Sequence, residues 1–160
     1  MFKVGDSPLQ NGEMEGVIIK KLKPFSDGRG WLAEMFRKDE IVSGIEPVMS
    51  YISVTYPGMV RGPHEHIEQT DYFFFHGKFK LYLWDNRDAS PTYKNKKIIE
   101  NADSHVVIIP PKVIHAYKNT GDKDGMVINF PDRLYAGWGR KGKIDEVRYE
   151  EDPENRFRIE

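Results

Sequence analysis

The chain has 160 residues, which is enough for one domain with a full hydrophobic core and too few for two domains of ordinary size. Its 24 basic and 25 acidic residues leave a net charge of -1, which excludes a whole-molecule field that would attract nucleic acid or an anionic membrane. The lack of cysteine excludes disulfides, thiolate nucleophiles and cysteine-based zinc sites, so any chemistry must come from histidine, tyrosine, carboxylates and lysine.

Short runs rich in β-branched and aromatic residues alternate with scattered glycines and prolines. Their length and composition are typical of strands. Apolar and polar residues alternate most clearly in 51–56 and 79–84, so these strands are expected to have one apolar face each. In chain order, the predicted strands cover residues 17–22, 31–36, 51–56, 72–75, 79–84, 106–109 and 126–130.

A helical pattern occurs only in one short segment, around residues 37–43. Many short strands need a second layer or a closed barrel to bury their apolar faces and edges, so we predict an all-β fold. We expect a single domain over residues 1–160, with an N-terminal strand segment and a short C-terminal tail. No run reaches the roughly 18 apolar residues of a membrane span and no signal-peptide pattern opens the chain, so we expect a cytoplasmic protein.

Two histidine segments carry the clearest chemical signal. His64 and His66 are two residues apart, so in an extended chain both side chains point to the same face, and His115 follows a later strand. The order of residues resembles the two sequence motifs of the cupin superfamily, which implies a double-stranded β-helix, or jelly-roll, barrel. The matching positions are His64, His66, Asp71, Gly77, Pro110, His115 and Asn119.

One interpretation of these residues is a metal site. Three imidazoles and a carboxylate can bind Zn, Fe, Mn or Ni, and the candidate ligands are His64, His66, Asp71 and His115. Asp71 comes one residue later than the acid of the motif, and such a shift turns a side chain to the other face of a strand unless a bulge absorbs it. In the other interpretation no metal is bound, and His66 forms a hydrogen bond to a glutamate or to water at the barrel mouth.

Four further motifs appear in a fixed order along most of the chain. They are the run 24–31 with Glu34 and Phe36, the run 58–64, the runs 85–87 and 90–93, and Tyr135 followed by Asp152 and Pro153. In residue type and order they resemble the Phe-x-Asp-x-Arg-Gly, Arg-Gly-x-His, Asp-x-Arg with Ser-Pro-Thr, and tyrosine motifs of dTDP-4-dehydrorhamnose 3,5-epimerases.

This resemblance implies a homodimeric barrel that needs no cofactor and binds a nucleotide-diphosphate sugar, namely a thymidine-diphospho-4-keto-6-deoxy sugar. It also implies that His64 removes the proton next to the C4 ketone and that Tyr135 returns one from the opposite face. A neutral imidazole and a protonated phenol suit these roles at neutral pH. By the same resemblance, substrate-binding residues are expected at Arg29, Glu34, Arg61, His115 and Lys118.

Removal of the proton next to the ketone leaves an enolate, whose oxygen must be stabilised. At the group that would stabilise it, the sequence departs from the family that it resembles. The family has a lysine shortly after the histidine, and here that place holds Thr70 or Asp71. A carboxylate would repel the enolate oxygen. The missing positive charge could come from His66, His115 or Lys118.

A second departure concerns the partner of the base. The family pairs its histidine with an aspartate on a C-terminal extension, whereas no aspartate follows Pro153 here. His64 would then be oriented by Glu65, by Asp71 or by water. Three hypotheses follow: a divergent sugar-nucleotide epimerase or isomerase, a metal-dependent enzyme on the same barrel, and a non-catalytic sugar-nucleotide-binding module.

Overall fold

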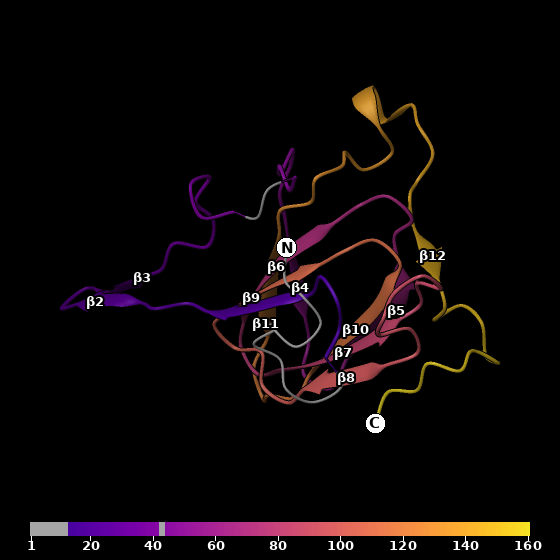
Figure 1. Ribbon diagram of the computed structural model, residues 1–160. Coiled ribbons are helices and arrows are strands. Elements are labelled where there is room, and N and C mark those ends of the chain that lie inside the picture. The colour runs from indigo at the N-terminus through magenta and orange to yellow at the C-terminus, as the bar shows by residue number, and fades with distance from the viewer. Residues whose placement is uncertain (1–12, 42–43) are drawn as a thin grey trace.

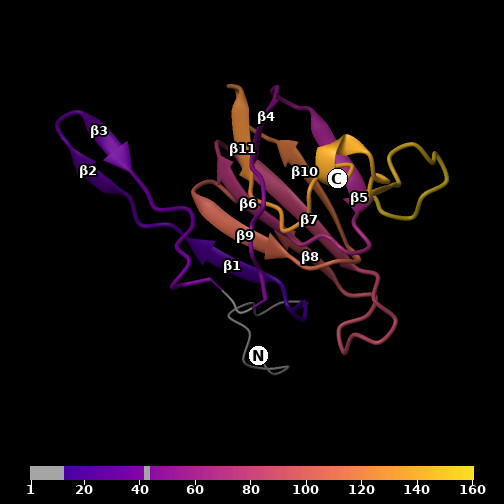
Figure 2. The same ribbon diagram turned by 90° about the horizontal axis from the view of Figure 1, so that it is seen from above.

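The structure is a computed structural model that describes residues 13–41 and 44–160. Two five-stranded antiparallel sheets form its body (Figures 1 and 2). The first sheet has the order β1 (Ile18–Lys21), β9 (His105–Ile109), β6 (Asp71–His76), β11 (Gly125–Asn129) and β4 (Tyr51–Thr55). The second has the order β12 (Val147–Arg148), β5 (Val60–Glu65), β10 (Val113–Asn119), β7 (Phe79–Asp85) and β8 (Lys96–Ile99). The predicted all-β, cupin-type class is confirmed.

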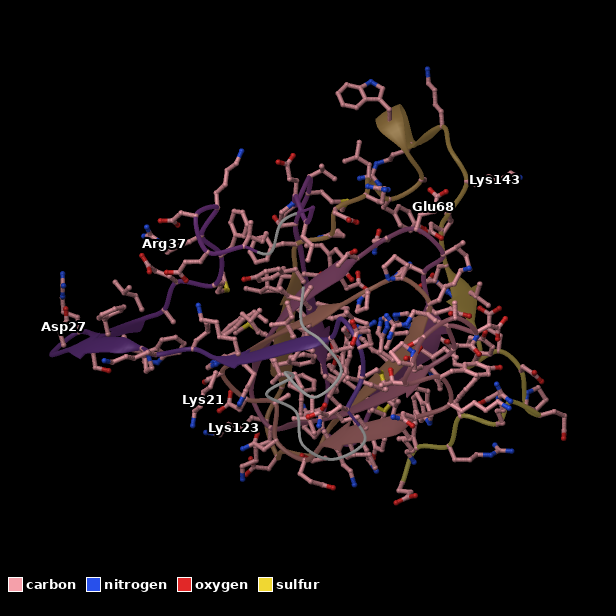
Figure 3. All side chains as sticks on the ribbon, viewed as in Figure 1. Lys21, Asp27, Arg37, Glu68, Lys123 and Lys143 are labelled. Carbon is pink, nitrogen blue, oxygen red and sulfur yellow. The ribbon has the colours of Figure 1, made fainter. Side chains whose placement is uncertain are left out.

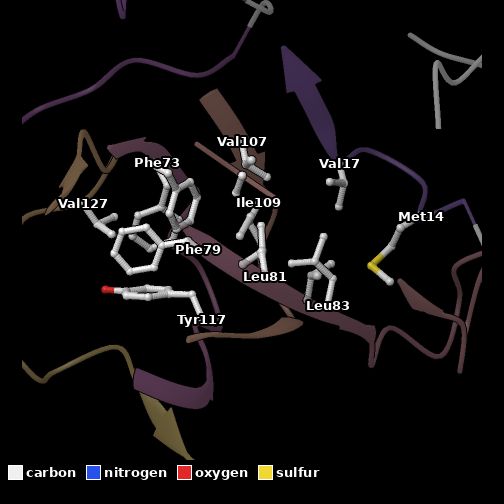
Figure 4. Close-up of a cluster of buried hydrophobic side chains, with 13 residues drawn as sticks. Met14, Val17, Phe73, Phe79, Leu81, Leu83, Val107, Ile109, Tyr117 and Val127 are labelled. Atoms are coloured by element: carbon white, nitrogen blue, oxygen red, sulfur yellow. The ribbon is translucent and has the colours of Figure 1, made fainter. Parts of the chain in front are cut away.

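The main core lies between the two sheets. Figure 4 shows Phe73 from the first sheet beside Phe79, Leu81 and Tyr117 from the second, all of them buried. Successive residues of a strand point to opposite faces, so Tyr72 and Phe74 belong to a different cluster on the outer face of the first sheet. The same alternation turns residue 71, two positions before Phe73, toward the interior.

A small hairpin projects from this body (Figures 1 and 2). It pairs β2 (Phe25–Asp27) with β3 (Gly30–Leu32), and we call residues 25–32 the arm. Its apolar side chains are exposed in the single chain: Phe25 is 57%, Trp31 53% and Leu32 62% exposed. Isolated two-stranded hairpins are only marginally stable in water. An arm with exposed aromatic side chains is therefore typical of a segment that packs against another surface.

The predicted strands and the observed strands agree for all five strands of the first sheet and for β7. The strand predicted over residues 31–36 is correct only at its start, because β3 ends at Leu32 and residues 33–36 form no strand. The sequence did not predict β5, β8 or β10, which contribute much of the second sheet. The helix expected around residues 37–43 is wrong: residues 38–40 form a turn, and residues 42–43 lie outside the described part. Ion pairs from Arg37 to Asp39 and Glu40 close this turn locally, and a segment this short cannot offset the cost of helix nucleation.

The C-terminal segment covers the outer face of the second sheet. Tyr149 and Phe157 pack against the buried side chains of Tyr82 and Trp84. Among the described residues, no helical segment has the length and apolar character needed to cross a membrane.

Candidate active site

A cavity of about 410 Å³ opens between the two sheets at the end where β5 and β10 carry their histidines. Its wall includes three residues that the resemblance assigned to the site, namely Arg61, His64 and Tyr135. His66 also lines it. The two histidines that were expected on one face of the chain therefore open into the same space.

Three imidazoles meet at the inner end of this cavity. His115 on β10 is the direct register partner of His64 on β5, and their ring centroids are 4.4 Å apart in an edge-to-face arrangement. His66 follows just beyond β5, with its ring centroid 5.8 Å from that of His64. One ring nitrogen from each histidine lies within 4.8 Å of the others.

The carboxylate of Asp71 lies against two of these rings. Its Oδ2 is 3.2 Å from Nε2 of His66 and 3.4 Å from Nε2 of His115. Its Oδ1 accepts hydrogen bonds of 2.8 Å from the amides of Gln69 and Asn129. Asp71 is only 1% exposed, so this buried charge is stabilised by polar partners on both oxygens.

Backbone contacts fix how the imidazoles face Asp71. Nδ1 of His115 lies 3.1 Å from the carbonyl oxygen of Val113, and Nδ1 of His66 contacts the carbonyl oxygen of Asp145. A carbonyl only accepts, so each Nδ1 carries the proton and each Nε2 faces the carboxylate. Orientation by a second contact is what keeps functional imidazoles in one tautomer.

The environment separates the charge states of the histidines. Burial and the neighbouring rings of His115 and His66 lower the pKa of His64 to about 2, so its imidazole is neutral at pH 7. Burial also lowers the pKa of His66, but the hydrogen bond and charge of Asp71 outweigh it and raise that pKa to about 9. The site therefore combines a neutral imidazole with an imidazolium–carboxylate pair.

Arg61 and Tyr135 lie on the cavity wall outside this cluster. The guanidinium of Arg61 is tied to β4 by hydrogen bonds to Oγ1 of Thr55 at 3.2 Å and to the carbonyl oxygen of Val54 at 2.9 Å. Tyr135 is 48% exposed and sits in the loop after β11. Its phenol is thus accessible to a ligand in the cavity.

Four other expected site residues do not line the cavity within one chain, and one of them, His115, is only 1% exposed. Arg29 lies on the turn of the arm and pairs with Asp27, which Figure 3 shows at the far end of the arm. Glu34 follows the arm and contacts Arg37 at 3.4 Å. Lys118 lies on β10, beyond the bulge that separates it from His115.

Sequence reasoning missed several polar residues of this site. Asn129 could have been found, because it continues the inward face of β11 two residues after the buried Val127. Asp145 could not, because its carboxylate accepts the backbone N–H groups of residues 67–69 across a separation of more than 70 residues. Glu150 also lines the cavity and was not predicted.

The fold and the site together define a class of protein: a cupin-type barrel with histidines and a tyrosine around an internal cavity. A family model described as dTDP-4-dehydrorhamnose 3,5-epimerase matches residues 11–141. The chain belongs to this family, whose members are isomerases of the epimerase class.

Three similar proteins illustrate the relationship. A probable low-salt glycan biosynthesis epimerase of Haloferax volcanii, Agl13, is 38% identical over 123 residues, which cover 74% of this chain and 79% of the relative. The spore coat polysaccharide biosynthesis protein SpsL of Bacillus subtilis is 32% identical over 125 residues, covering 76% and 82%. A dTDP sugar isomerase from Desulfovibrio desulfuricans has the same fold, with a TM-score of 0.74, 24% identity and 87% of each chain covered.

Proposed function

We propose that the protein epimerises a nucleotide-linked 4-keto-6-deoxy sugar at a carbon next to the C4 ketone, without a cofactor. The observation that supports this most directly is that His64 and Tyr135 line one cavity together with Arg61. His64 is neutral and can accept the proton, and the phenol of Tyr135 can donate one.

His64 and Tyr135 together account for every proton that the proposed reaction moves. His64 takes the proton from the carbon, and the electron pair of the broken C–H bond forms the enolate with its charge on the C4 oxygen. Tyr135 then donates its phenolic proton to the other face of that carbon, which restores the ketone with inverted configuration. Solvent takes the proton from His64 and returns one to Tyr135, so both groups regain their starting states.

His66 is the candidate for the charge that the family's lysine supplies. It lines the cavity, and Asp71 holds it as a cation at neutral pH. A fixed positive charge in a buried site stabilises an enolate oxygen more than it would in water. Because Asp71 is paired with the cationic His66, its own charge is offset and does not face the enolate alone.

Arg61 is the candidate ligand for the diphosphate, since a planar guanidinium suits phosphate oxygens. Arg29 and Glu34 lie on or beside the arm and do not line their own chain's cavity. We therefore extend the proposal to a homodimer in which each arm contributes to the cavity of the partner chain. The exposed Trp31 and Leu32 favour such packing.

Mixing two inactive variants tests this exchange of arms. His64→Asn lacks the base and Arg29→Ala lacks the arm's guanidinium, and both are expected to be inactive alone. If the two are unfolded and refolded together, random pairing places an intact arm over an intact base in one site of every mixed dimer, giving about a quarter of wild-type activity. An arm that serves its own chain would give no recovery.

The proposed reaction itself is tested by incubating chelator-treated protein with a dTDP-4-keto-6-deoxyhexose in D₂O. We expect deuterium at C3, at C5 or at both, together with inverted product, as followed by NMR. The proposal fails if no deuterium enters with or without added divalent metals.

A second candidate is a metal-dependent enzyme on the same residues. His64, His66 and His115 bring three ring nitrogens together, and the buried Oδ2 of Asp71 and Nε2 of His115 make no well-aligned hydrogen bond. These donors fit Zn, Mn, Fe or Ni, and a bound ion would act as a Lewis acid on the ketone. However, nitrogens up to 4.8 Å apart would have to close to ~3.4 Å around a tetrahedral ion with bonds of about 2.1 Å.

Elemental analysis of protein purified without chelator separates the two candidates. The metal-free epimerase predicts substoichiometric metal and an exchange rate in D₂O that is unchanged by EDTA. One bound transition metal per chain, with exchange lost on its removal and restored on its return, would instead establish the metal-dependent enzyme.

A further inference from the structure

The C-terminal strand β12 pairs with β5 at the position of the proposed base, His64. In the pairing of β12 with β5, Arg148 is the register partner of His64. The backbone N–H groups of Tyr149 and Glu150 both donate to the carbonyl oxygen of Pro63, at 2.9 and 3.3 Å. These bonds fix the backbone of residue 150 directly beside His64.

The side chain of Glu150 then reaches the imidazole. Its Oε1 lies 4.0 Å from Nδ1 of His64, and both residues line the cavity. The two side chains are 35% and 14% exposed, so water screens the contact only in part. A shift of about 1 Å would turn this contact into a hydrogen bond of ordinary length.

The other carboxylates near His64 are engaged elsewhere. Glu65 accepts a 2.6 Å hydrogen bond from the phenol of Tyr149, and Asp71 faces His66 and His115. The remaining acids of the cavity wall are also occupied, since Glu146 pairs with Arg148 and Asp145 accepts three backbone N–H groups. The sequence-based candidates Glu65 and Asp71 therefore do not contact Nδ1 of His64.

We propose that Glu150 is the positioning residue of His64, an inference that rests on the proposed epimerase function. Its carboxylate accepts the proton on Nδ1, which leaves Nε2 without a proton and free to act as the base. When Nε2 takes the proton of the sugar, the nearby negative charge stabilises the imidazolium. A carboxylate orients the base in the same way in nucleophile–base–carboxylate triads. Here the carboxylate comes from the turn after β12, and the base is on β5.

Three variants test this role, with Glu151→Ala as the matched control. Glu151 is the next residue, carries the same charge and points to Arg148 rather than to His64. Glu150→Ala is expected to lower kcat about 10- to 100-fold and to leave KM within about twofold. The reason is that His64 loses its orientation, whereas the residues proposed to bind the substrate are unchanged. Glu150→Gln, which keeps an acceptor but not the charge, should recover part of kcat, and Glu151→Ala should match the wild type.

The tautomer of His64 gives a readout that does not require turnover. In long-range ¹H–¹⁵N spectra of chelator-treated protein, the wild type and Glu150→Gln should carry the His64 proton on Nδ1, and Glu150→Ala should shift it toward Nε2. Glu150→Ala with an unchanged tautomer, or with kcat within twofold of the wild type, overturns the inference. Absence of exchange in the wild type would instead overturn the epimerase function, and the tautomer would still decide the role of Glu150.

Discussion

Replacing His64 with asparagine is expected to reduce deuterium incorporation into the sugar by about 10²- to 10⁴-fold, the usual contribution of a positioned general base. The imidazole of His64 is neutral in the folded protein, so it is available as a base across the neutral pH range. Asparagine keeps a side chain of similar reach, but it cannot accept a proton at this pH.

A matched control separates this loss from a general effect on the fold. His105→Asn changes an imidazole at the start of β9 that does not line the cavity, and its exchange rate should equal that of the wild type. The thermal midpoints of both variants should stay close to that of the unmodified protein. If His64→Asn retained exchange within about tenfold of the wild type, His64 would not be the base.

Gly62→Ala is expected to lower the free energy of unfolding by about 2–4 kcal/mol, in the range of severe backbone and packing defects. A Cβ at this position would lie 2.5 Å from the carbonyl oxygen of His115 and 3.1 Å from Cα of Ala116. Gly62 also has a φ of +84°, which residues other than glycine rarely adopt. To relieve the contact, β5 must move away from β10, and this movement separates His64 from His115.

Gly58→Ala provides the comparison for this variant. Gly58 has a similar φ of +76°, but a Cβ there would meet nothing within 4 Å. It should therefore cost only the backbone term, about 1–2 kcal/mol, and leave activity intact. Denaturant unfolding measures both values, and equal losses for the two variants would show that β5 and β10 are not packed as closely as described.

The interior direction of the site residues could be predicted from strand alternation. His64 and His66 were expected on one face, and both line the cavity. Asp71 was harder to assign, since the motif places the acid one residue earlier. Counting from Phe73 and Phe75, which are in the main core, shows that residue 71 belongs to the same inward face.

The strands that carry the site were the ones the sequence did not reveal. β5 and β10 hold Arg61, His64 and His115 on faces that would be apolar in an ordinary strand, so their alternation is interrupted. Local rules are expected to fail where function places polar groups in a core. The contact of Glu150 with His64 joins residues 86 positions apart, and no local pattern encodes it.

The arm shows a different limit of sequence reasoning. The predicted strand 31–36 overlaps only the end of the arm, at β3, and β2 was not predicted. The apolar side chains of the arm are exposed in the single chain. Periodicity reports that a face is apolar without saying which surface buries it. For Arg29 and Glu34, the sequence therefore predicts a binding role but does not say to which chain's cavity they would contribute.

The most direct test of the account compares wild type and Tyr135→Phe in D₂O with chelator present, by NMR of the sugar carbons. If His64 and Tyr135 act on opposite faces, the wild type incorporates deuterium and inverts the carbon. The variant should then still exchange the proton through His64 without forming inverted product. Inversion by Tyr135→Phe at the wild-type rate, or a wild type that incorporates no deuterium, would contradict the proposed pair of acid and base.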